Sequence, residues 1–177
     1  AVGPGGALRL LDVGGGPGTY TLAFLRAVPE LRATLFDLPE VVEIARENAT
    51  RAGLVDRVDL VAGDLRTDAL PGGHDLAFVS ALVHMLGPDG NVALFRKVRE
   101  ALVPGGRIVL RDHVMSPDRT APRAGALFAV NMLVGTKAGG TFTYEELASW
   151  LGEAGFVRPR LVKEGERMDA LVEAFRP

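Results

Sequence analysis

The fold of this chain is decided by the stretch Leu10-Leu11-Asp12-Val13-Gly14-Gly15-Gly16-Pro17-Gly18-Thr19-Tyr20. An apolar run over residues 8–13 predicts a buried strand, which ends in four glycines within five residues. A helical pattern starts at Thr19. Glycines permit positive φ and let a ligand approach the main chain, and the first turn of a helix offers unpaired N–H groups. A strand, a glycine turn and a helix therefore predict a nucleotide-type site at the carboxyl end of a parallel sheet.

The spacing of the glycines narrows the kind of nucleotide. Gly14, Gly16 and Gly18 form G-x-G-x-G, and Thr19 occupies the place of the third glycine in the dinucleotide fingerprint G-x-G-x-x-G. No Lys-Ser/Thr pair follows, so a P-loop also fits poorly. The loop alone leaves open that it is only a tight turn.

Length and composition bound the remaining choices. The 177 residues suit one domain, and the net charge of −2 is spread out, which favours neither nucleic acid nor an anionic membrane as a partner. The chain has no cysteine, which excludes disulfides, thiolate metal sites and a cysteine nucleophile. No signal peptide or membrane-length apolar run is visible, so we expect a cytoplasmic protein. The start at Ala1, with Gly3-Pro4-Gly5-Gly6 just before the first strand, leads us to expect further sequence on the N-terminal side.

The order of elements predicts a doubly wound α/β domain. Strands are expected at 8–13, 31–36, 57–62, 75–80 and 107–114, with helices between most of them at 19–28, 39–52 and 92–102. A short helix is expected near 125–134, and the capping-box pair Thr143 and Glu146 opens another that Gly155 ends. Residues 164–167 join two final strands, 157–163 and 169–175, as a hairpin. We therefore expect a mostly parallel seven-stranded sheet with an antiparallel edge hairpin.

Polar residues follow the predicted parallel strands, at the edge where ligands of such sheets bind. They are Asp37, Asp64, Ser80, His84, Asp112 and His113. Asp37 stands about 20 residues beyond the glycine loop, where an acidic residue accepts hydrogen bonds from ribose hydroxyls. Any single one of these residues could instead form a turn or a cap, but together they predict a site.

Three stretches, Leu11–Gly18, Phe36-Asp37-Leu38-Pro39 and Gly63-Asp64, make the chain resemble the S-adenosylmethionine-dependent small-molecule O-methyltransferases. That family includes plant caffeic acid-type and bacterial polyketide-tailoring enzymes. The similarity continues through His84 and Pro104–Arg107 and then through Asn131-Met132-Leu133 to Glu146. The resemblance implies a Rossmann-like class I methyltransferase fold over residues 1–177, as the C-terminal catalytic domain of a longer protein. It also implies a homodimer formed through an N-terminal helical domain.

The resemblance further implies a role for each matched residue. The methionine portion of S-adenosyl-L-methionine would lie on the glycine loop, and Asp37 would bind the ribose hydroxyls. Leu38, Asp64 and Leu65 would contact the adenine. The cofactor-binding residues would be Gly14, Gly16, Gly18, Asp37, Leu38, Asp64, Leu65 and, near the sulfonium, Ser80. His84 would be the catalytic base and Asp112 the acidic residue that orients it.

These roles agree with the chemistry of methyl transfer. The transferred methyl is already on a positively charged sulfur, so no metal is expected; the enzyme aligns an oxygen and removes its proton. A free imidazole has a pKa of about 6.5 and a phenol about 10, so a carboxylate such as Asp112 is needed to stabilise the imidazolium. Of the other histidines, His74 is expected on the surface at the wrong side of the sheet. His113, which alternates with Asp112, is expected to pack under a helix.

Two departures from the family pattern leave the function open. His84 is followed by Met85-Leu86 instead of Asp-Trp, and the glutamate of the family's Gly-Gly-Lys-Glu-Arg-Thr segment is absent from residues 139–143. The alternative hypotheses are an inactive S-adenosylmethionine-binding module and, less favoured, a nicotinamide-dependent dehydrogenase. A small-molecule acceptor would meet Phe128, Asn131 and Met132, although Phe128 and Met132 could equally be core residues.

Overall fold

The computed structural model describes residues 6–177. Residues 1–5, which include most of the glycine-rich stretch before the first strand, lie outside the described part. Within residues 6–177, no helix combines the length and the apolar character needed to cross a membrane.

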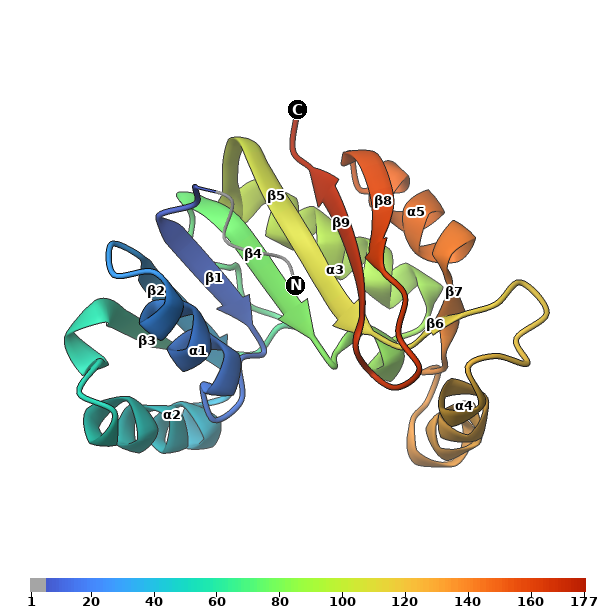
Figure 1. Ribbon diagram of the computed structural model, residues 1–177, viewed down its shortest axis with the longest axis horizontal. Helices are drawn as coiled ribbons and strands as arrows, with labels where there is room; N and C mark the ends of the chain where they lie inside the picture. Colours follow the sequence, from blue (N-terminus) through green and yellow to red (C-terminus); the bar gives the residue numbers. More distant parts are fainter. Residues whose placement is uncertain (1–5) are drawn as a thin grey trace.

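A seven-stranded sheet forms the centre of the molecule, as predicted (Figure 1). Its order is β3-β2-β1-β4-β5-β9-β8. The first five strands in the chain run parallel, β9 is antiparallel to β5, and β8 pairs antiparallel with β9 at the edge. The strands are β1 Arg9–Val13, β2 Arg32–Asp37, β3 Val58–Ala62, β4 His74–Ser80, β5 Leu102–Asp112, β8 Val157–Lys163 and β9 Ala170–Phe175.

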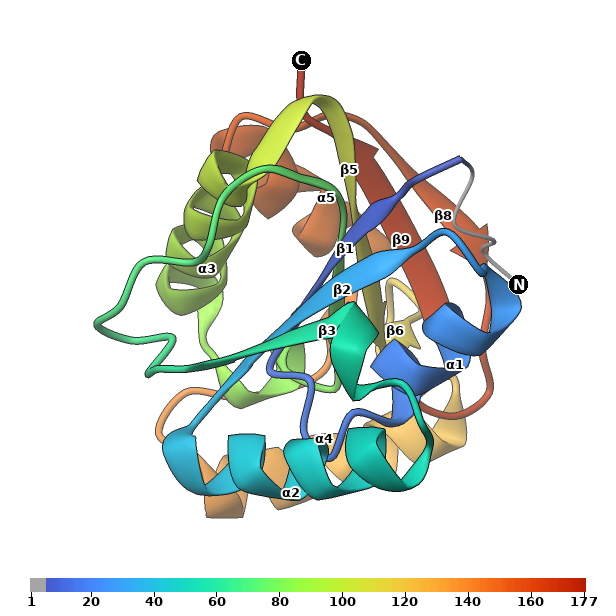
Figure 2. The same ribbon diagram turned by 90° about the vertical axis from the view of Figure 1, so that its left-hand side faces the viewer.

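Helices cover both faces of the sheet, as Figure 2 shows for α1 on one side and α3 and α5 on the other. The helices are α1 Thr19–Ala27, α2 Pro39–Arg51, α3 Pro88–Ala101, α4 Arg123–Gly135 and α5 Tyr144–Glu153, with 3-10 turns η1 Val55–Arg57 and η2 Val83–Met85. Alternation along the strands separates two cores. Leu10 packs with α1 and α2, whereas its neighbour Leu11 packs with α3 and α5.

The structure adds details that the sequence pattern did not predict. The fifth strand ends at Asp112, and Val114–Met115 (β6) pairs separately with Phe142–Thr143 (β7) in a small parallel sheet. Helix α3 begins at Pro88, before the predicted start, because proline suits the first helical turn. The capping box of α5, in contrast, was predicted and is confirmed: the Glu146 N–H donates to Thr143 Oγ1.

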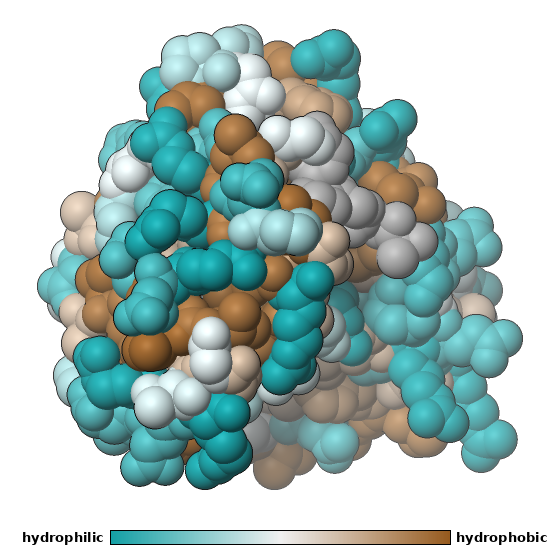
Figure 3. Space-filling view, turned by 60° about the vertical axis from the view of Figure 1, so that its left-hand side comes forward, coloured by the Kyte–Doolittle hydropathy of each residue, from teal (hydrophilic) through white to brown (hydrophobic). Residues whose placement is uncertain are grey.

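No helix connects β3 to β4; residues 63–73 form an irregular segment instead. Leu60 and Val61 on the edge strand β3 are therefore only half-buried. Figure 3, which brings this side of the molecule forward, shows apolar surface bordered by polar side chains.

Candidate active site at the carboxyl edge of the sheet

The glycine loop takes the left-handed backbone conformation that its composition predicts. Gly14, Gly16 and Gly18 have φ of 65°, 56° and 81°, and the Gly14 N–H donates to the Phe36 carbonyl at 2.8 Å. At Gly15 an added Cβ would lie 2.6 Å from Cγ of Leu35, whereas the space above Gly16 is open within 4 Å. The loop is thus packed tightly against Leu35 at Gly15 and leaves free space at Gly16.

Asp37 ties the end of β2 to this loop. Its carboxylate accepts from the Gly16 N–H at 2.7 Å and from the Leu38 N–H at 2.7 Å, one bond to each oxygen. A carboxylate has about four acceptor positions, so both oxygens retain capacity for hydroxyl donors. Leu38 is 39% exposed beside it and offers an apolar surface. These residues fit a nucleoside. Asp37 offers acceptors to the two ribose hydroxyls, and Leu38 offers an apolar contact to the flat base.

Asp64 lies at the next turn and is engaged by a neighbour. The Arg66 guanidinium donates to both of its carboxylate oxygens, and these hydrogen bonds lower the pKa of Asp64 to about 2. The Lys97 ammonium donates to the Leu65 carbonyl at 2.6 Å. Asp64 and Leu65 therefore lie at the expected edge, and their contact with an adenine stays a prediction.

Ser80 ends β4 beside the loop strand β1. Its hydroxyl accepts from Nη1 of Arg111 at 3.3 Å. The following residue, Ala81, has φ of 55°, which is uncommon for a residue with a side chain. Such strain is found most often at functional sites.

His84 and Asp112 form a buried pair, with His84 6% and Asp112 3% exposed. Nδ1 of His84 lies 3.0 Å from both carboxylate oxygens of Asp112. Asp112 also accepts from the His113 N–H at 2.8 Å. The carboxylate favours the tautomer with the proton on Nδ1, which leaves Nε2 of His84 as the proton acceptor.

Asn91 supports this pair, and the sequence reasoning missed it. Its side-chain amide donates to the carbonyls of Val83 and Leu86, which bracket the η2 turn that carries His84. Asn91 is fully buried on α3. The sequence signal for this role was an amide side chain on the helix face that otherwise carries apolar residues.

No glutamate lies at His84 from the segment 139–143; the Gly140 N–H donates to the His84 carbonyl instead. Within residues 6–177, Asp112 is the only carboxylate paired with the imidazole. The same part of the chain holds no group of three or more metal-binding side chains.

The other two histidines occupy different places. The expectation that His74 is a surface residue is wrong: it is 6% exposed, and its Nε2 lies 2.9 Å from Thr34 Oγ1. The strand β4 starts at His74, one residue earlier than predicted, and this draws the side chain inward. Burial also lowers its pKa. His113 packs under helix α4, as expected, with its ring 5.1 Å from that of Phe128.

The three residues expected to contact an acceptor are not equivalent. Phe128 is half-buried and lies edge-on to His84, with ring centroids 4.9 Å apart. Met132 is half-buried and Asn131 is exposed on α4. The structure therefore brings Phe128 to the histidine, but leaves Asn131 on the surface.

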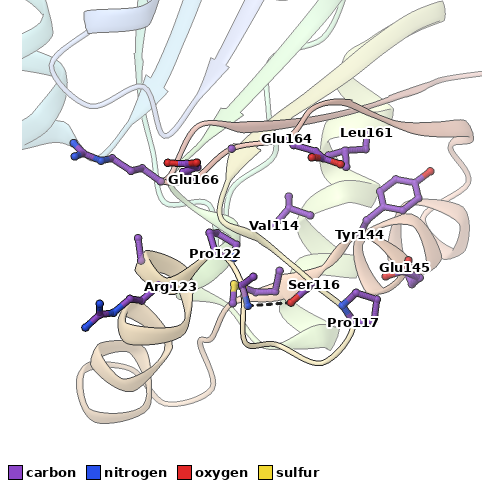
Figure 4. Close-up of a pocket in the computed structure, with 15 residues that line it drawn as sticks. Val114, Ser116, Pro117, Pro122, Arg123, Tyr144, Glu145, Leu161, Glu164 and Glu166 are labelled. Carbon is purple, nitrogen blue, oxygen red and sulfur yellow. Dashed lines mark hydrogen bonds between the residues drawn. The ribbon is translucent and has the colours of Figure 1, made fainter.

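A cavity of about 1090 Å³ lies elsewhere, between the loop after β6, the start of α5 and the β8–β9 connection (Figure 4). Its lining includes Ser116, Tyr144 and Glu166, but neither His84 nor the glycine loop. We place the candidate active site at the His84–Asp112 pair because a proton acceptor and its orienting carboxylate lie there, although the cavity of Figure 4 does not include them.

Comparison with known proteins agrees with this geometry. A family model of the O-methyltransferase domain matches residues 5–157. The chain is 35% identical over 158 residues to 3-hydroxy-5-methyl-1-naphthoate 3-O-methyltransferase of Streptomyces sahachiroi, covering 89% of this chain and 46% of the relative. It is 35% identical over 150 residues to the tetracenomycin polyketide synthesis 8-O-methyl transferase TcmO of Streptomyces glaucescens, covering 85% and 44%.

Solved structures give the same result. The S-adenosylmethionine-dependent methyltransferase SibL, in its apo form, superposes with a TM-score of 0.88 at 34% identity, covering 98% of this chain and 51% of that one. Human N-acetylserotonin methyltransferase in complex with SAM has a TM-score of 0.86 at 26% identity, covering 96% and 48%. The chain thus spans about half the length of the relatives it matches. By its sequence, its fold and the residues at its sheet edge, the chain belongs to the O-methyltransferase family.

Proposed function

We propose that this domain binds S-adenosylmethionine and transfers its methyl group to a hydroxyl of a small aromatic or polyketide acceptor, with His84 as the general base. The observation that carries the proposal is the buried His84–Asp112 pair, with Nδ1 3.0 Å from both carboxylate oxygens. His84 follows β4 and Asp112 ends β5, and β4 lies directly beside the strand that leads into the glycine loop.

The cofactor part of the proposal rests on the loop and on Asp37. The open space above Gly16, the free acceptor positions of Asp37 and the exposed Leu38 suit the methionine, ribose and adenine portions. Two relatives solved with SAM and with SAH, the human enzyme and PigF, share the fold at TM-scores of 0.86 and 0.88. When bound, S-adenosylmethionine supplies a methyl group on a positively charged sulfur.

The chain's own residues then have two tasks. They hold the acceptor hydroxyl in line with the methyl group, and His84 takes the hydroxyl proton on Nε2 while Asp112 stabilises the imidazolium. General-base catalysis of this kind contributes about 10²- to 10⁴-fold to a rate. The absent family glutamate does not disrupt the pair, because Asp112 already fixes the tautomer.

The acceptor class follows from α4 and from the relatives. Phe128 places an aromatic ring at the base, and α4 carries no charged residue after Arg123. Two relatives are named for a naphthoate and for tetracenomycin polyketide synthesis. We include Phe128 and Met132 as acceptor contacts; Asn131 would reach an acceptor only through a change at the exposed side of α4.

The proposal extends to three expectations from the sequence: an additional N-terminal dimerisation domain, a homodimer of the full-length protein, and a cytoplasmic location. The length of the relatives supports the first of these, since the chain covers 46% of the naphthoate methyltransferase.

The test is methyl transfer by the full-length protein to a panel of phenolic acceptors, followed by mass spectrometry, with His84→Ala beside the wild type. We expect turnover to fall at least about 100-fold in the variant, while calorimetry shows unchanged binding of S-adenosylhomocysteine. Binding without turnover of any acceptor would favour the inactive binding module. Binding of NAD in place of S-adenosylhomocysteine would favour the dehydrogenase.

A further inference from the structure

Arg111 lies one residue before Asp112 on β5 and points to the opposite face of the sheet. Its strand partner is Ser80, which accepts a hydrogen bond from Nη1 at 3.3 Å. Its guanidinium lies over the ring of Tyr20, 5.0 Å from the centroid. Tyr20 is the second residue of α1, two positions beyond Gly18. The cation is therefore held at the carboxyl edge, beside the glycine loop.

This guanidinium has no carboxylate partner within residues 6–177: none lies within 4.0 Å, the distance of an ion pair. The acidic residues of the same edge are engaged elsewhere. Asp37 accepts from two backbone N–H groups, Asp64 from Arg66, and Asp112 from His84. Asp169, on the nearby β8–β9 connection, pairs with Lys163 at 2.6 Å, and the Arg111 charge helps to lower the pKa of Asp169 from beyond ion-pair distance.

A half-buried arginine with four of its five N–H donors unused by the described part of the chain is a receptor for an anion. The planar fork of a guanidinium matches a carboxylate with two parallel hydrogen bonds. Tyr20 limits the positions of the guanidinium through its ring face, so less side-chain entropy is lost when an anion binds. The strained Ala81, directly after Ser80, is a second sign that the backbone here is shaped around a ligand.

We propose that Arg111 binds the α-carboxylate of the methionine portion of the cofactor, with Ser80 and Tyr20 as the residues that position its guanidinium. This inference rests on the proposed function. The α-carboxylate is the only anionic group of S-adenosylmethionine, and the N–H groups of all four loop glycines already donate to oxygen atoms of the chain. Arg111 supplies the missing counter-charge from the side of the sheet that carries α1, while His84 and Asp112 work from the other side.

Calorimetry with two ligands tests the inference without any turnover. S-adenosylhomocysteine carries the α-carboxylate, and 5′-methylthioadenosine lacks the whole amino-acid portion. We expect Arg111→Met to weaken S-adenosylhomocysteine about 10- to 100-fold, the range of a charged hydrogen bond, and to leave 5′-methylthioadenosine within about twofold. Arg111→Lys, which keeps the charge without the fork, is expected to fall between the wild type and Arg111→Met.

Arg158→Met is the matched control. Its guanidinium also stacks on an aromatic ring, that of Phe175 at 4.9 Å, but at the opposite edge of the sheet. We expect this variant to bind both ligands as the wild type does. Equal losses for both ligands in Arg111→Met, or no loss in either, would overturn the inference. A wild type that binds neither ligand would instead overturn the proposed function, and Arg111→Lys provides the comparison if Arg111→Met does not fold.

Discussion

The carboxyl edge of the sheet has two halves that are built in different ways. In the half that we propose for the cofactor, backbone groups of the glycine loop and the carboxylate of Asp37 form the site, with Leu38 as an exposed apolar neighbour. In the acceptor half, α4 has no charged residue after its first position, and Leu133 and Val134 are 79% and 84% exposed. The helix meets the core mainly where Gly125 touches Met115 and where Phe128 covers two histidines.

The two halves differ in how much of their surface is covered by the described part of the chain. The residues that we propose for cofactor recognition all lie at strand ends and turns within residues 6–177. An exposed apolar helix is instead typical of a surface that a further element covers. The His84–Asp112 pair stands between the halves, so substitutions on either side of it can separate their contributions.

Asp112→Asn is expected to have the largest effect. An asparagine keeps the shape of the side chain, but its amide can donate to Nδ1 and so favour the wrong imidazole tautomer. We expect kcat to fall about 10²- to 10⁴-fold, with unchanged affinity for S-adenosylhomocysteine in calorimetry. A loss of cofactor affinity equal to the loss of rate would mean that the two halves are not separable at this residue.

Gly15→Ala and Gly139→Ala form the next pair of tests, one for each half. At Gly15 a methyl group would lie 2.6 Å from Cγ of the buried Leu35, and at Gly139 it would overlap the His84 carbonyl oxygen. Each overlap costs about 1–3 kcal/mol. We expect Gly15→Ala to weaken S-adenosylhomocysteine binding, and Gly139→Ala to lower kcat at unchanged cofactor affinity. Identical losses in both variants would contradict the division.

Asp12→Asn tests the interior of the cofactor half by its pH dependence. Burial raises the pKa of Asp12 to about 6 from its ordinary 3.8. The folded state therefore holds this proton more tightly than the unfolded state, and ionisation of Asp12 costs stability as pH rises from about 4 to about 6. At pH 7.5 the asparagine variant is expected to be about 1–3 kcal/mol more stable in urea unfolding, since two pKa units correspond to about 2.7 kcal/mol.

The gain should vanish below about pH 4, where the folded and unfolded wild type both hold the proton. A variant that is less stable at every pH would show that the hydrogen bond from Thr21 to the Asp12 carboxylate outweighs its desolvation. The asparagine side chain can still accept from Thr21, so the variant changes the charge and leaves the acceptor in place.

The features that the sequence could predict are those that depend on residues close together in the chain. The seven strands, the loop and the placement of Asp37 follow from local patterns, because glycine spacing and strand periodicity act within a few residues. Strand order predicts that His84 and Asp112 lie at the same edge of the sheet, since parallel strands bring their ends together. Their roles as base and orienting carboxylate come from the resemblance to the family.

Features that depend on distant contacts were not predictable in this way. His74 is buried because Thr34 of another strand accepts or donates at its ring, and no local pattern records that pairing. The support of η2 by Asn91 and the stacking of Arg111 on Tyr20 join separate elements as well. The exposure of Asn131 depends on how α4 sits on the core, which periodicity does not determine for a helix that is apolar on most sides.

Leu133→Gln with Val134→Gln is expected to have the smallest effect, and it tests the acceptor half directly. Both side chains are largely exposed, and glutamine keeps a good helix propensity. In the chain of residues 1–177 we expect the free energy of unfolding to change by less than about 0.5 kcal/mol. The matched control is Leu147→Ala on α5, where the side chain is 1% exposed, and removal should cost about 2–5 kcal/mol.

A cost near that of the control would mean that α4 is covered in solution. Its dependence on protein concentration would then show whether a second copy covers it, since a dimer contributes stability by mass action. With the expected small cost, Leu133 and Val134 contribute little to the folding of residues 1–177. These two side chains would then be available to a further element that covers the helix, a surface that the cofactor half does not present.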